Sequence, residues 1–446
     1  MRIDRLRMWN FKRFADHTLE LHPRFTLLVG DNGAGKTTIL DALAVAAGIW
    51  LVKPPDTMLA NSGRNILRNE IRLGVRHAGD RSRFEECKPV SVTAAGEIAG
   101  NELEWRRQIR LHGSRTTNVE AAEALRLIKN HFARDHTGEK LISPVIAYYG
   151  AGRAWLPSRS RDPTTLRAHR SARRWEAFYD CFQERIRVGD LRIWFQREAI
   201  ASANRGGRWR PGYRVVTGAI VRCIPEADGL WYDGDRQEIV LSIAGQAQPF
   251  SNLSAGQRMM AALVADVATK AVMQNSHLVS EAGEDDPEDP AVLQQTPGLV
   301  LVDEIDVHLH PKWQRRVVRD LKETFPRIQF VCTSHSPFII QSLEAGELRT
   351  LDPGGPALLE YANRSIEDIA EEIQKVDVPQ QSLHATEFAE ATKRYFSLLR
   401  SRADDTDDEL QAAEVAYREA AKRYSGSPGV SAILELEALA RRKTGR

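Results

Sequence analysis

Cysteine is scarce in this sequence, and no arrangement of cysteines points to chemistry. Four occur among 446 residues, Cys87, Cys181, Cys223 and Cys332, and they lie far apart with no C-x-x-C spacing. A disulfide framework and a zinc knuckle both need cysteines in defined, closely spaced pairs. The pattern argues against both, and we expect reduced thiols in a cytoplasmic protein.

A targeting segment and a membrane-spanning segment are also missing. Residues 1–5 are charged and have no apolar signal core. The longest apolar run, residues 39–52, contains Asp41 and is shorter than the ~20 residues that cross a bilayer. We therefore expect no membrane partner.

An excess of one charge sign is absent from the whole chain but present locally. The chain has 62 basic and 60 acidic side chains. Residues 153–214 hold fifteen Arg, no Lys and six acids, with four interleaved tryptophans, Trp155, Trp175, Trp194 and Trp209. Arginine beside aromatic rings suits phosphate backbones and stacked bases. However, Trp175, Phe178 and Phe182 have the spacing of a helical core, so a DNA surface and a packed helical subdomain both stay open.

Two further absences limit the architecture. No heptad pattern is sustained, which excludes a long coiled-coil arm. Residues 276–297 have six acids, three prolines and no Lys or Arg. This composition predicts a disordered loop to which we assign no chemistry.

A glycine-rich stretch at residues 30–37 dominates what the sequence does contain. It reads G-D-N-G-A-G-K-T and fits the phosphate-loop template G-x-x-x-x-G-K-[ST] at every fixed position. The apolar run 25–29 before it predicts a buried strand, and residues 38–47 after it predict a helix. Since the template needs this order of strand, loop and helix, we predict an ATP site here.

The residue types in this loop account for phosphate binding. Glycine lets the backbone approach phosphate oxygens, and the N–H groups and the positive end of the following helix form an anion cradle. Lys36 adds a mobile charge for the outer phosphates, and the Thr37 hydroxyl is a ligand for Mg²⁺. The predicted nucleotide-binding residues are Gly30, Asp31, Asn32, Gly33, Ala34, Gly35, Lys36, Thr37 and Thr38.

Two acids end a second apolar run. Residues 298–302 predict a buried strand that is followed by Asp303 and Glu304. Ligands of parallel sheets bind beyond the carboxyl ends of the strands. We predict that Asp303 binds Mg²⁺, directly or through water, and that Glu304 deprotonates the attacking water. His335 follows the next predicted strand, 328–333, and is either a γ-phosphate or water contact or a structural histidine.

Residues 253–257, L-S-A-G-Q, decide the class of ATPase. Ser254 is a good helix N-cap. In this order, after the phosphate loop and before Asp303 and His335, the string resembles the L-S-G-G-Q signature of the ABC-type ATPase superfamily, with Ala255 as the one departure. The resemblance implies that Ser254, Gly256 and Gln257 bind ATP held by a second copy. It therefore implies a head-to-tail dimer with two composite sites.

The residues after Glu304 indicate which branch of the superfamily the sequence resembles. They read I-D-V-H-L-H-P, which resembles the soluble branch of overcoming-lysogenization-defect ATPases; residues 10–14, N-F-K-R-F, resemble RecF- and SMC-like heads. A metal pair formed by His308 and His310 is disfavoured by this match. No glutamine is found at the expected Q-loop position, where residues 148–153 lie.

Over most of the chain the sequence is similar to the ATPase subunit of Septu-type anti-phage systems, including retron-associated ones. The similarity rests on L-S-x-G-Q, D-E-I-D-V-H-L-H-P-K-W-Q-R-R-V-V, T-S-H-S-P, and the stretches 366–369 and 376–379. It implies a separate HNH-type nuclease as partner, and this chain has no HNH cluster of its own. The alternative is a RecF- or SMC-like repair ATPase that clamps DNA; a transporter subunit fits less well.

The predicted fold is α/β, an ABC-type P-loop ATPase head with an inserted helical subdomain and a C-terminal helical extension. We expect four parts: 1–150, the N-terminal part of the ATPase lobe with the phosphate loop; 151–250, an inserted Arg- and Trp-rich, mainly helical region; 251–355, the signature helix, acidic loop, Walker B strand and switch histidine; and 356–446, a C-terminal helical region.

Overall fold

The structure is a computed structural model with two compact units, residues 1–364 and 365–446. It describes residues 1–54, 63–78, 81–154, 175–179, 181–186, 188–279, 290–351, 364–400 and 407–423. Two predicted features lie outside these ranges: Trp155 of the Arg-rich region, and residues 280–289, which belong to the predicted acidic loop.

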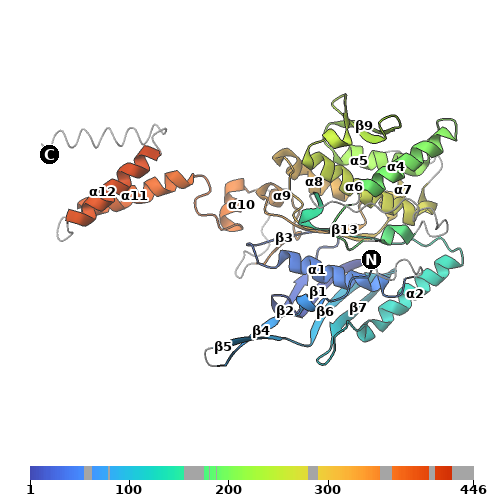
Figure 1. The fold of residues 1–446 in the computed structure, drawn as a ribbon, viewed down its shortest axis with the longest axis horizontal. Helices are drawn as coiled ribbons and strands as arrows, with labels where there is room; N and C mark the ends of the chain where they lie inside the picture. Colours follow the sequence, from blue (N-terminus) through green and yellow to red (C-terminus); the bar gives the residue numbers. More distant parts are fainter. Residues whose placement is uncertain are drawn as a thin grey trace. The chain divides into compact units, whose positions relative to one another are not determined.

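A five-stranded parallel sheet forms the centre of the first unit (Figure 1). Its order is β14 (Leu348–Thr350), β3 (Phe25–Val29), β13 (Ile328–Thr333), β12 (Gly298–Val302) and β8 (Val145–Tyr149). Every residue of β3, β8, β12 and β13 is buried, which explains why these strands read as continuous apolar runs. The predicted α/β class is confirmed, and the strands end at one shared edge.

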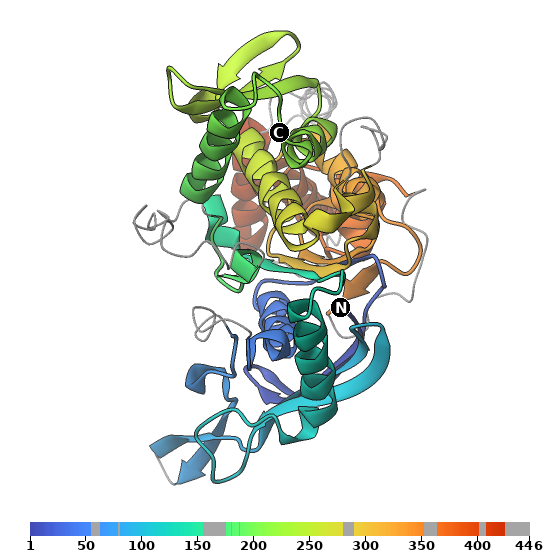
Figure 2. The ribbon, with the colours of Figure 1, turned by 90° about the vertical axis from the view of Figure 1, so that its right-hand side faces the viewer.

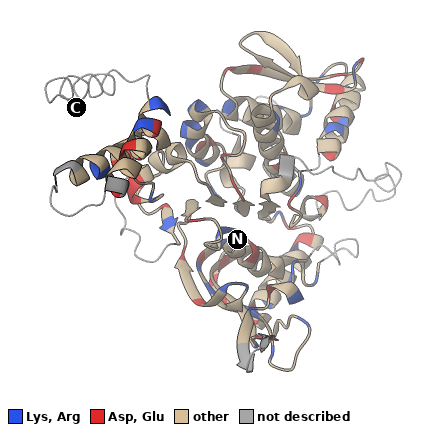
Figure 3. Cartoon of the chain, turned by 60° about the vertical axis from the view of Figure 1, so that its left-hand side comes forward, with Lys and Arg blue, Asp and Glu red and all other residues tan. Residues whose placement is uncertain are grey.

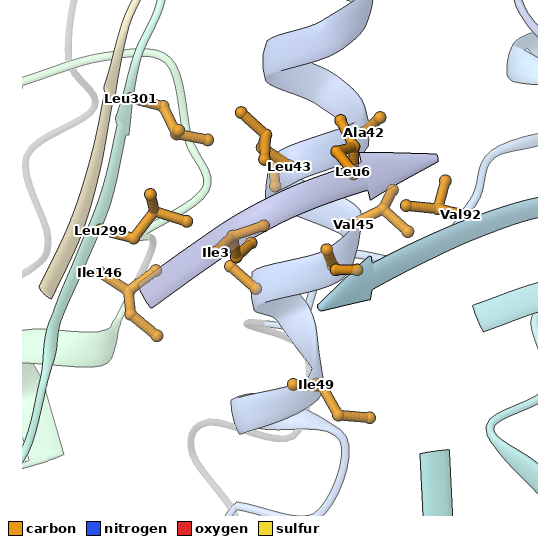
Figure 4. Close-up of a cluster of buried hydrophobic side chains, with 14 of the residues drawn as sticks. Ile3, Leu6, Ala42, Leu43, Val45, Ile49, Val92, Ile146, Leu299 and Leu301 are labelled. Atoms are coloured by element: carbon orange, nitrogen blue, oxygen red, sulfur yellow. The ribbon is translucent and has the colours of Figure 1, made fainter. Parts of the chain in front are cut away.

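Helix α1 (Lys36–Ala47) lies between the parallel sheet and a four-stranded antiparallel sheet (Figure 1). The antiparallel order is β2 (Phe14–Glu20), β1 (Arg2–Phe11), β6 (Val90–Ile98) and β7 (Asn101–Ile109). Ile3, Leu43 and Leu299, which come from β1, α1 and β12, meet in the core between the sheets (Figure 4). The first three strands of the chain are divided between the two sheets, because β1 pairs with β2 and β6 while β3 pairs with β13.

Two side chains of β7 hold the C-terminal end of α1. Trp105 donates its indole N–H to the Ala46 carbonyl at 3.1 Å. Arg107 is 1% exposed and donates to the carbonyls of Val45, at 2.6 Å, and of Arg64. The Val45 and Ala46 carbonyls lie in the last turn of α1, where a helix runs out of intrahelical donors, and the Arg64 bond ties the segment after α1 to the same strand. Burial lowers the pKa of Arg107 to about 10, so it stays charged at neutral pH.

Helices cover the opposite face of the parallel sheet (Figure 1). They are α4 (Val188–Ala203), α5 (Pro211–Cys223), α6 (Ala255–Gln274), α8 (Pro311–Thr324) and α9 (Pro337–Gln341). A three-stranded antiparallel sheet, which the sequence did not predict, lies beside them: β9 (Ala227–Asp233), β10 (Glu238–Ile243) and β11 (Gln246–Pro249). The inserted region is therefore mixed in its described part.

The remaining elements of the first unit are peripheral. The hairpin of β4 (Leu73–Ala78) and β5 (Arg81–Glu86) projects from one end, and α2 (Ala122–His136) covers β7 (Figure 2). Helix α7 (Ala291–Gln295) falls in a stretch predicted as a disordered loop, and the prediction is wrong there. The reason is that Val292 and Leu293 are buried despite the acidic composition around them.

The second unit is helical in its described part, as predicted. It contains α10 (Ile366–Glu372), α11 (Leu383–Arg400) and α12 (Asp407–Arg423). Helices α11 and α12 share a small core of Phe388, Tyr395 and Tyr417. In neither unit does a described helix have the length and apolar character needed to cross a membrane.

Candidate active site

The phosphate loop connects β3 to α1 at the carboxyl edge of the parallel sheet. Gly33 and Gly35 have φ values of +82° and +107°, which L side chains rarely adopt. A Cβ at Gly35 would also lie 2.6 Å from the Phe14 ring, because the β1–β2 turn packs against the loop. Lys36 Nζ donates to the carbonyls of Gly30, at 2.7 Å, and Asp31, at 3.1 Å. The lysine therefore lies over its own loop.

Asp303 joins three elements of the site. Its Oδ2 accepts from the Thr37 hydroxyl at 2.9 Å, across 266 residues of sequence. Its Oδ1 accepts from the Thr333 hydroxyl at 2.6 Å, at the end of β13. Asp303 is 7% exposed, so these bonds fix the carboxylate against the start of α1. The structure thus brings Thr37 and Asp303 together, and their role as Mg²⁺ ligands stays a prediction.

Glu304 and His335 follow the neighbouring strands β12 and β13. The Glu304 backbone N–H donates to the Thr333 hydroxyl at 2.7 Å, and Glu304 has φ of +50°. This turned backbone directs the chain away from the strand immediately after Asp303. Glu304 is half-buried and His335 is exposed, so both are accessible at the edge where the phosphate loop lies.

The residues present fit both a nucleotide and Mg²⁺. The Thr37 hydroxyl and the Asp303 carboxylate are hard oxygen donors 2.9 Å apart, which is the ligand type Mg²⁺ takes beside phosphates. No atom of the described residues lies within 4 Å of a Cβ built at Gly33, so among them the loop is open on that side. The N–H groups at the start of α1 complete an anion cradle.

The signature sequence starts helix α6. Ser254 and Gln257 form a reciprocal capping box: the Ser254 N–H donates to Gln257 Oε1 at 2.9 Å, and the Gln257 N–H donates to Ser254 Oγ at 3.2 Å. Ser254 is exposed and Gly256 is buried. The Cα of Gly256 faces the loop that follows Glu304, because a Cβ there would collide with the His308 carbonyl oxygen and lie 3.2 Å from its carbon.

We expect the Gly256→Ala variant to be destabilised by about 1–3 kcal/mol, because the added methyl group meets backbone that cannot rotate away. Thermal unfolding of the full chain measures the effect. Gly234→Ala is the matched control, since nothing lies within 4 Å of a Cβ built there. Equal melting temperatures for the two variants would contradict the packing role of Gly256.

Sequence reasoning missed several residues of the site. Thr333 has no predicted role beyond its place in T-S-H-S-P, although a hydroxyl at a strand end is a usable signal when two acids end the neighbouring strand. Tyr149 Oη donates to Asp266 on α6 at 2.6 Å, which links β8 to the signature helix. Burial raises the pKa of Tyr149 well above its usual value, so it remains a donor.

The structure also brings a glutamine to the edge strand β8, where the sequence placed none. The N–H of Tyr148 donates to the Cys181 carbonyl at 2.7 Å, and the N–H of Gly150 donates to the Glu184 carbonyl at 2.9 Å. Residues 181–184, which include Gln183, therefore run beside the end of β8. This pairing spans more than thirty residues of sequence and has no local signal.

The three described tryptophans of the Arg-rich region pack on other aromatic rings. Trp209 stacks on Tyr213 at 3.9 Å between centroids, Tyr213 stacks on Trp194 at 6.3 Å, and Trp175 stacks on Phe178 at 6.2 Å. Along the ribbon of the described residues, Lys and Arg positions alternate with Asp and Glu positions (Figure 3). Both observations favour the packed helical subdomain over a base-stacking surface, and DNA binding stays a prediction.

Two protein-family models match the chain. One, described as an AAA domain, matches residues 5–192. The other, described as "AAA domain, putative AbiEii toxin, Type IV TA system", matches residues 244–341. The first contains the phosphate loop, and the second contains the signature helix, Asp303, Glu304 and His335. These matches agree with the sheet order and the Thr37–Asp303 contact, which give the chain the fold of a P-loop ATPase head.

The chain is similar to curated proteins that are named for retron and Septu systems. The chain is 32% identical over 158 residues to the "Retron Vc95 probable ATPase" of Vibrio cholerae serotype O1 biovar El Tor, covering 34% of this chain and 28% of that protein. It is 24% identical over 355 residues to the "Septu protein PtuA" of Bacillus mycoides (strain KBAB4), covering 78% and 40%. It is 22% identical over 417 residues to the "Retron Ec83 probable ATPase" of Escherichia coli, covering 79% and 72%.

These relatives confirm the predicted similarity to the ATPases of Septu- and retron-type systems. The chain spans less than half the length of the first two and about three quarters of the third. What the whole relatives do is therefore carried to this chain only as a proposal.

Proposed function

We propose that the chain binds and hydrolyses ATP with Mg²⁺ in a head-to-tail dimer, and that ATP-dependent assembly controls a separate nuclease in anti-phage defence. The single observation behind the ATPase part is the Thr37–Asp303–Thr333 bridge, which holds the phosphate loop and two strand ends together. The dimer rests on the exposed Ser254 at the start of α6, because an exposed helix N-terminus suits an anion presented by a second copy.

In this proposal the chain's own groups divide the work of hydrolysis. The loop N–H groups and Lys36 bind the phosphates, while Thr37 and Asp303 hold Mg²⁺, which neutralises developing phosphate charge when bound. Glu304 orients the attacking water and takes its proton. His335 donates a hydrogen bond to the γ-phosphate or to the water. Ser254, Gly256 and Gln257 close the partner's site.

Removing the lysine charge tests the phosphate-binding role. We expect Lys36→Ala to weaken ATP binding by about 1.5–3 kcal/mol, roughly 10- to 150-fold in Kd, because a charge-assisted contact is lost. Titration with a fluorescent ATP analogue measures this change. Lys53→Ala, on an exposed lysine beyond α1, should leave the affinity unaltered. Equal affinity for wild type and Lys36→Ala would exclude this loop as the nucleotide site.

The defence role rests on the Septu- and retron-type relatives and proposes an HNH-type nuclease as the partner in the cytoplasm. Purification of the tagged chain from its own host, followed by identification of co-purifying proteins, tests it. Co-purification of an HNH nuclease, together with greater phage sensitivity on deletion, would support the proposal. A chain that never associates with a nuclease, and whose loss leaves phage sensitivity unchanged, would contradict it. Recovery of DNA or a recombination mediator would favour the repair ATPase.

A further inference from the structure

Gln314, in the second turn of α8, connects two loops of the site through one side-chain amide. Its Nε2 donates to the Leu309 carbonyl at 2.8 Å. Its Oε1 accepts from the Ser336 hydroxyl at 2.6 Å. Gln314 is half-buried and Ser336 is 6% exposed, so water competes poorly for these bonds. Gln314 is not among the residues predicted to bind nucleotide or metal or to act in catalysis.

The first loop, residues 304–310, carries the contact with the signature helix. Its backbone is tied to β13 by the Ile305 N–H, which donates to the Thr333 carbonyl at 3.0 Å. It then turns through His308, at φ of +63°, whose carbonyl packs on Gly256. Since Leu309 is the next residue, the Gln314 bond fixes the backbone beside the signature helix.

The second loop, residues 334–336, carries His335. The Ser336 N–H donates to the buried Ser334 hydroxyl at 2.8 Å, and the Phe338 N–H donates to Ser336 Oγ at 3.2 Å. Ser336 is therefore fixed by its own neighbours and by Gln314. If His335 moved toward or away from the nucleotide, the adjacent Ser336 would move with it. The Gln314 amide would then shift and move the Leu309 backbone.

We propose that Gln314 is a positioning residue that couples the histidine of one ATP site to the signature sequence that closes the other. The inference rests on the proposed head-to-tail dimer, because there Gly256 of one copy acts on ATP held by its partner. Glutamine suits this place because its amide donates and accepts at once. A glutamate keeps the shape but has no N–H for the Leu309 carbonyl, and a leucine makes neither bond.

Helix α8 itself does not depend on this amide. It begins with Pro311, and the His310 ring Nδ1 accepts from the Lys312 N–H at 3.3 Å. Its packing comes from Val317 and Leu321, both buried. Replacement of Gln314 should therefore leave the fold intact and change only the link between the loops.

The test compares Gln314→Glu and Gln314→Leu with Lys312→Ala, an exposed position on the same helix. We expect both Gln314 variants to unfold within a few degrees of wild type, since each loses one or two hydrogen bonds of about 1 kcal/mol, and to bind ATP within about twofold of wild type, while kcat falls roughly tenfold. Hydrogen exchange of the backbone amides in 305–310 should be faster. In the Glu304→Gln background, ATP-driven dimerisation should also weaken.

The readouts separate this inference from the proposed function. Hydrogen exchange needs no hydrolysis, so unchanged exchange in 305–310 for Gln314→Glu overturns the inference whatever the ATPase result. A parallel loss of melting temperature, ATP affinity and kcat also overturns it, because the amide would then be merely structural. The proposed function is contradicted by two other results: a wild type that does not hydrolyse ATP, or a Glu304→Gln variant that does not dimerise with ATP.

Discussion

The Glu304→Gln variant is expected to bind ATP and to hydrolyse it about 100- to 10,000-fold more slowly than wild type. The amide keeps the shape of the side chain at the end of β12 but cannot take a proton from water. Asp303 and Thr37 are untouched, so nucleotide affinity should remain. Because ATP is no longer consumed, the dimer that it stabilises should accumulate.

Single-turnover hydrolysis and size-exclusion chromatography with and without ATP measure the two effects. Glu323→Gln is the matched control, since this glutamate lies on α8 with 63% of its side chain exposed. Wild-type turnover in Glu304→Gln would remove Glu304 from the general-base role. A slow variant that stays monomeric with ATP would instead count against the composite sites.

The second large effect is expected on stability, when the buried guanidinium of Arg107 beside the end of α1 is removed. We expect Arg107→Met to lower the free energy of unfolding of the first unit by about 3 kcal/mol, because it leaves the buried Val45 carbonyl and the part-buried Arg64 carbonyl without their donor. The pKa of Arg107, about 10, places its charge loss well above neutrality. The cost should therefore be the same at pH 6 and pH 8.

Denaturation followed by tryptophan fluorescence measures this unit alone, because all nine tryptophans precede residue 365. Arg106→Met is the matched control: Arg106 is the next residue on β7, is 43% exposed, and pairs with Glu120 at 3.0 Å. An exposed pair of this kind contributes about 1 kcal/mol or less. Equal losses for the two variants would show that the Val45 and Arg64 carbonyls do not need Arg107.

The elements that the sequence predicted well share one property: their signal is local. The strands 25–29, 298–302 and 328–333 were readable because both faces are buried, which leaves an unbroken apolar run. The phosphate loop was readable because glycine is needed at positive φ at fixed spacing. Sheet β9–β11 and helix α7 were missed because short elements are decided by what they pack against.

The residues of the candidate site also differ in whether their signal in the sequence is local. Lys36, Thr37, Asp303 and Glu304 follow from short strings whose chemistry is fixed by residue type and order. Two donors that fix the surrounding structure carry no such string. Thr333, which donates to Asp303, and Gln314, which donates to the Leu309 carbonyl, look in the sequence like ordinary strand and helix residues. Their partners are distant in sequence or belong to another element, so no periodicity marks them.

By itself the sequence determined the class of this protein: a phosphate loop, two strand-end acids and a signature helix in ATPase order. Only the tertiary structure decided that β1 and β3 enter different sheets, that Thr37 meets Asp303 across 266 residues, and that Gly256 packs on His308. The reason is physical. Backbone conformation and burial follow from neighbouring residues, whereas hydrogen-bond partners are chosen when separate elements dock and buried polar groups must be paired.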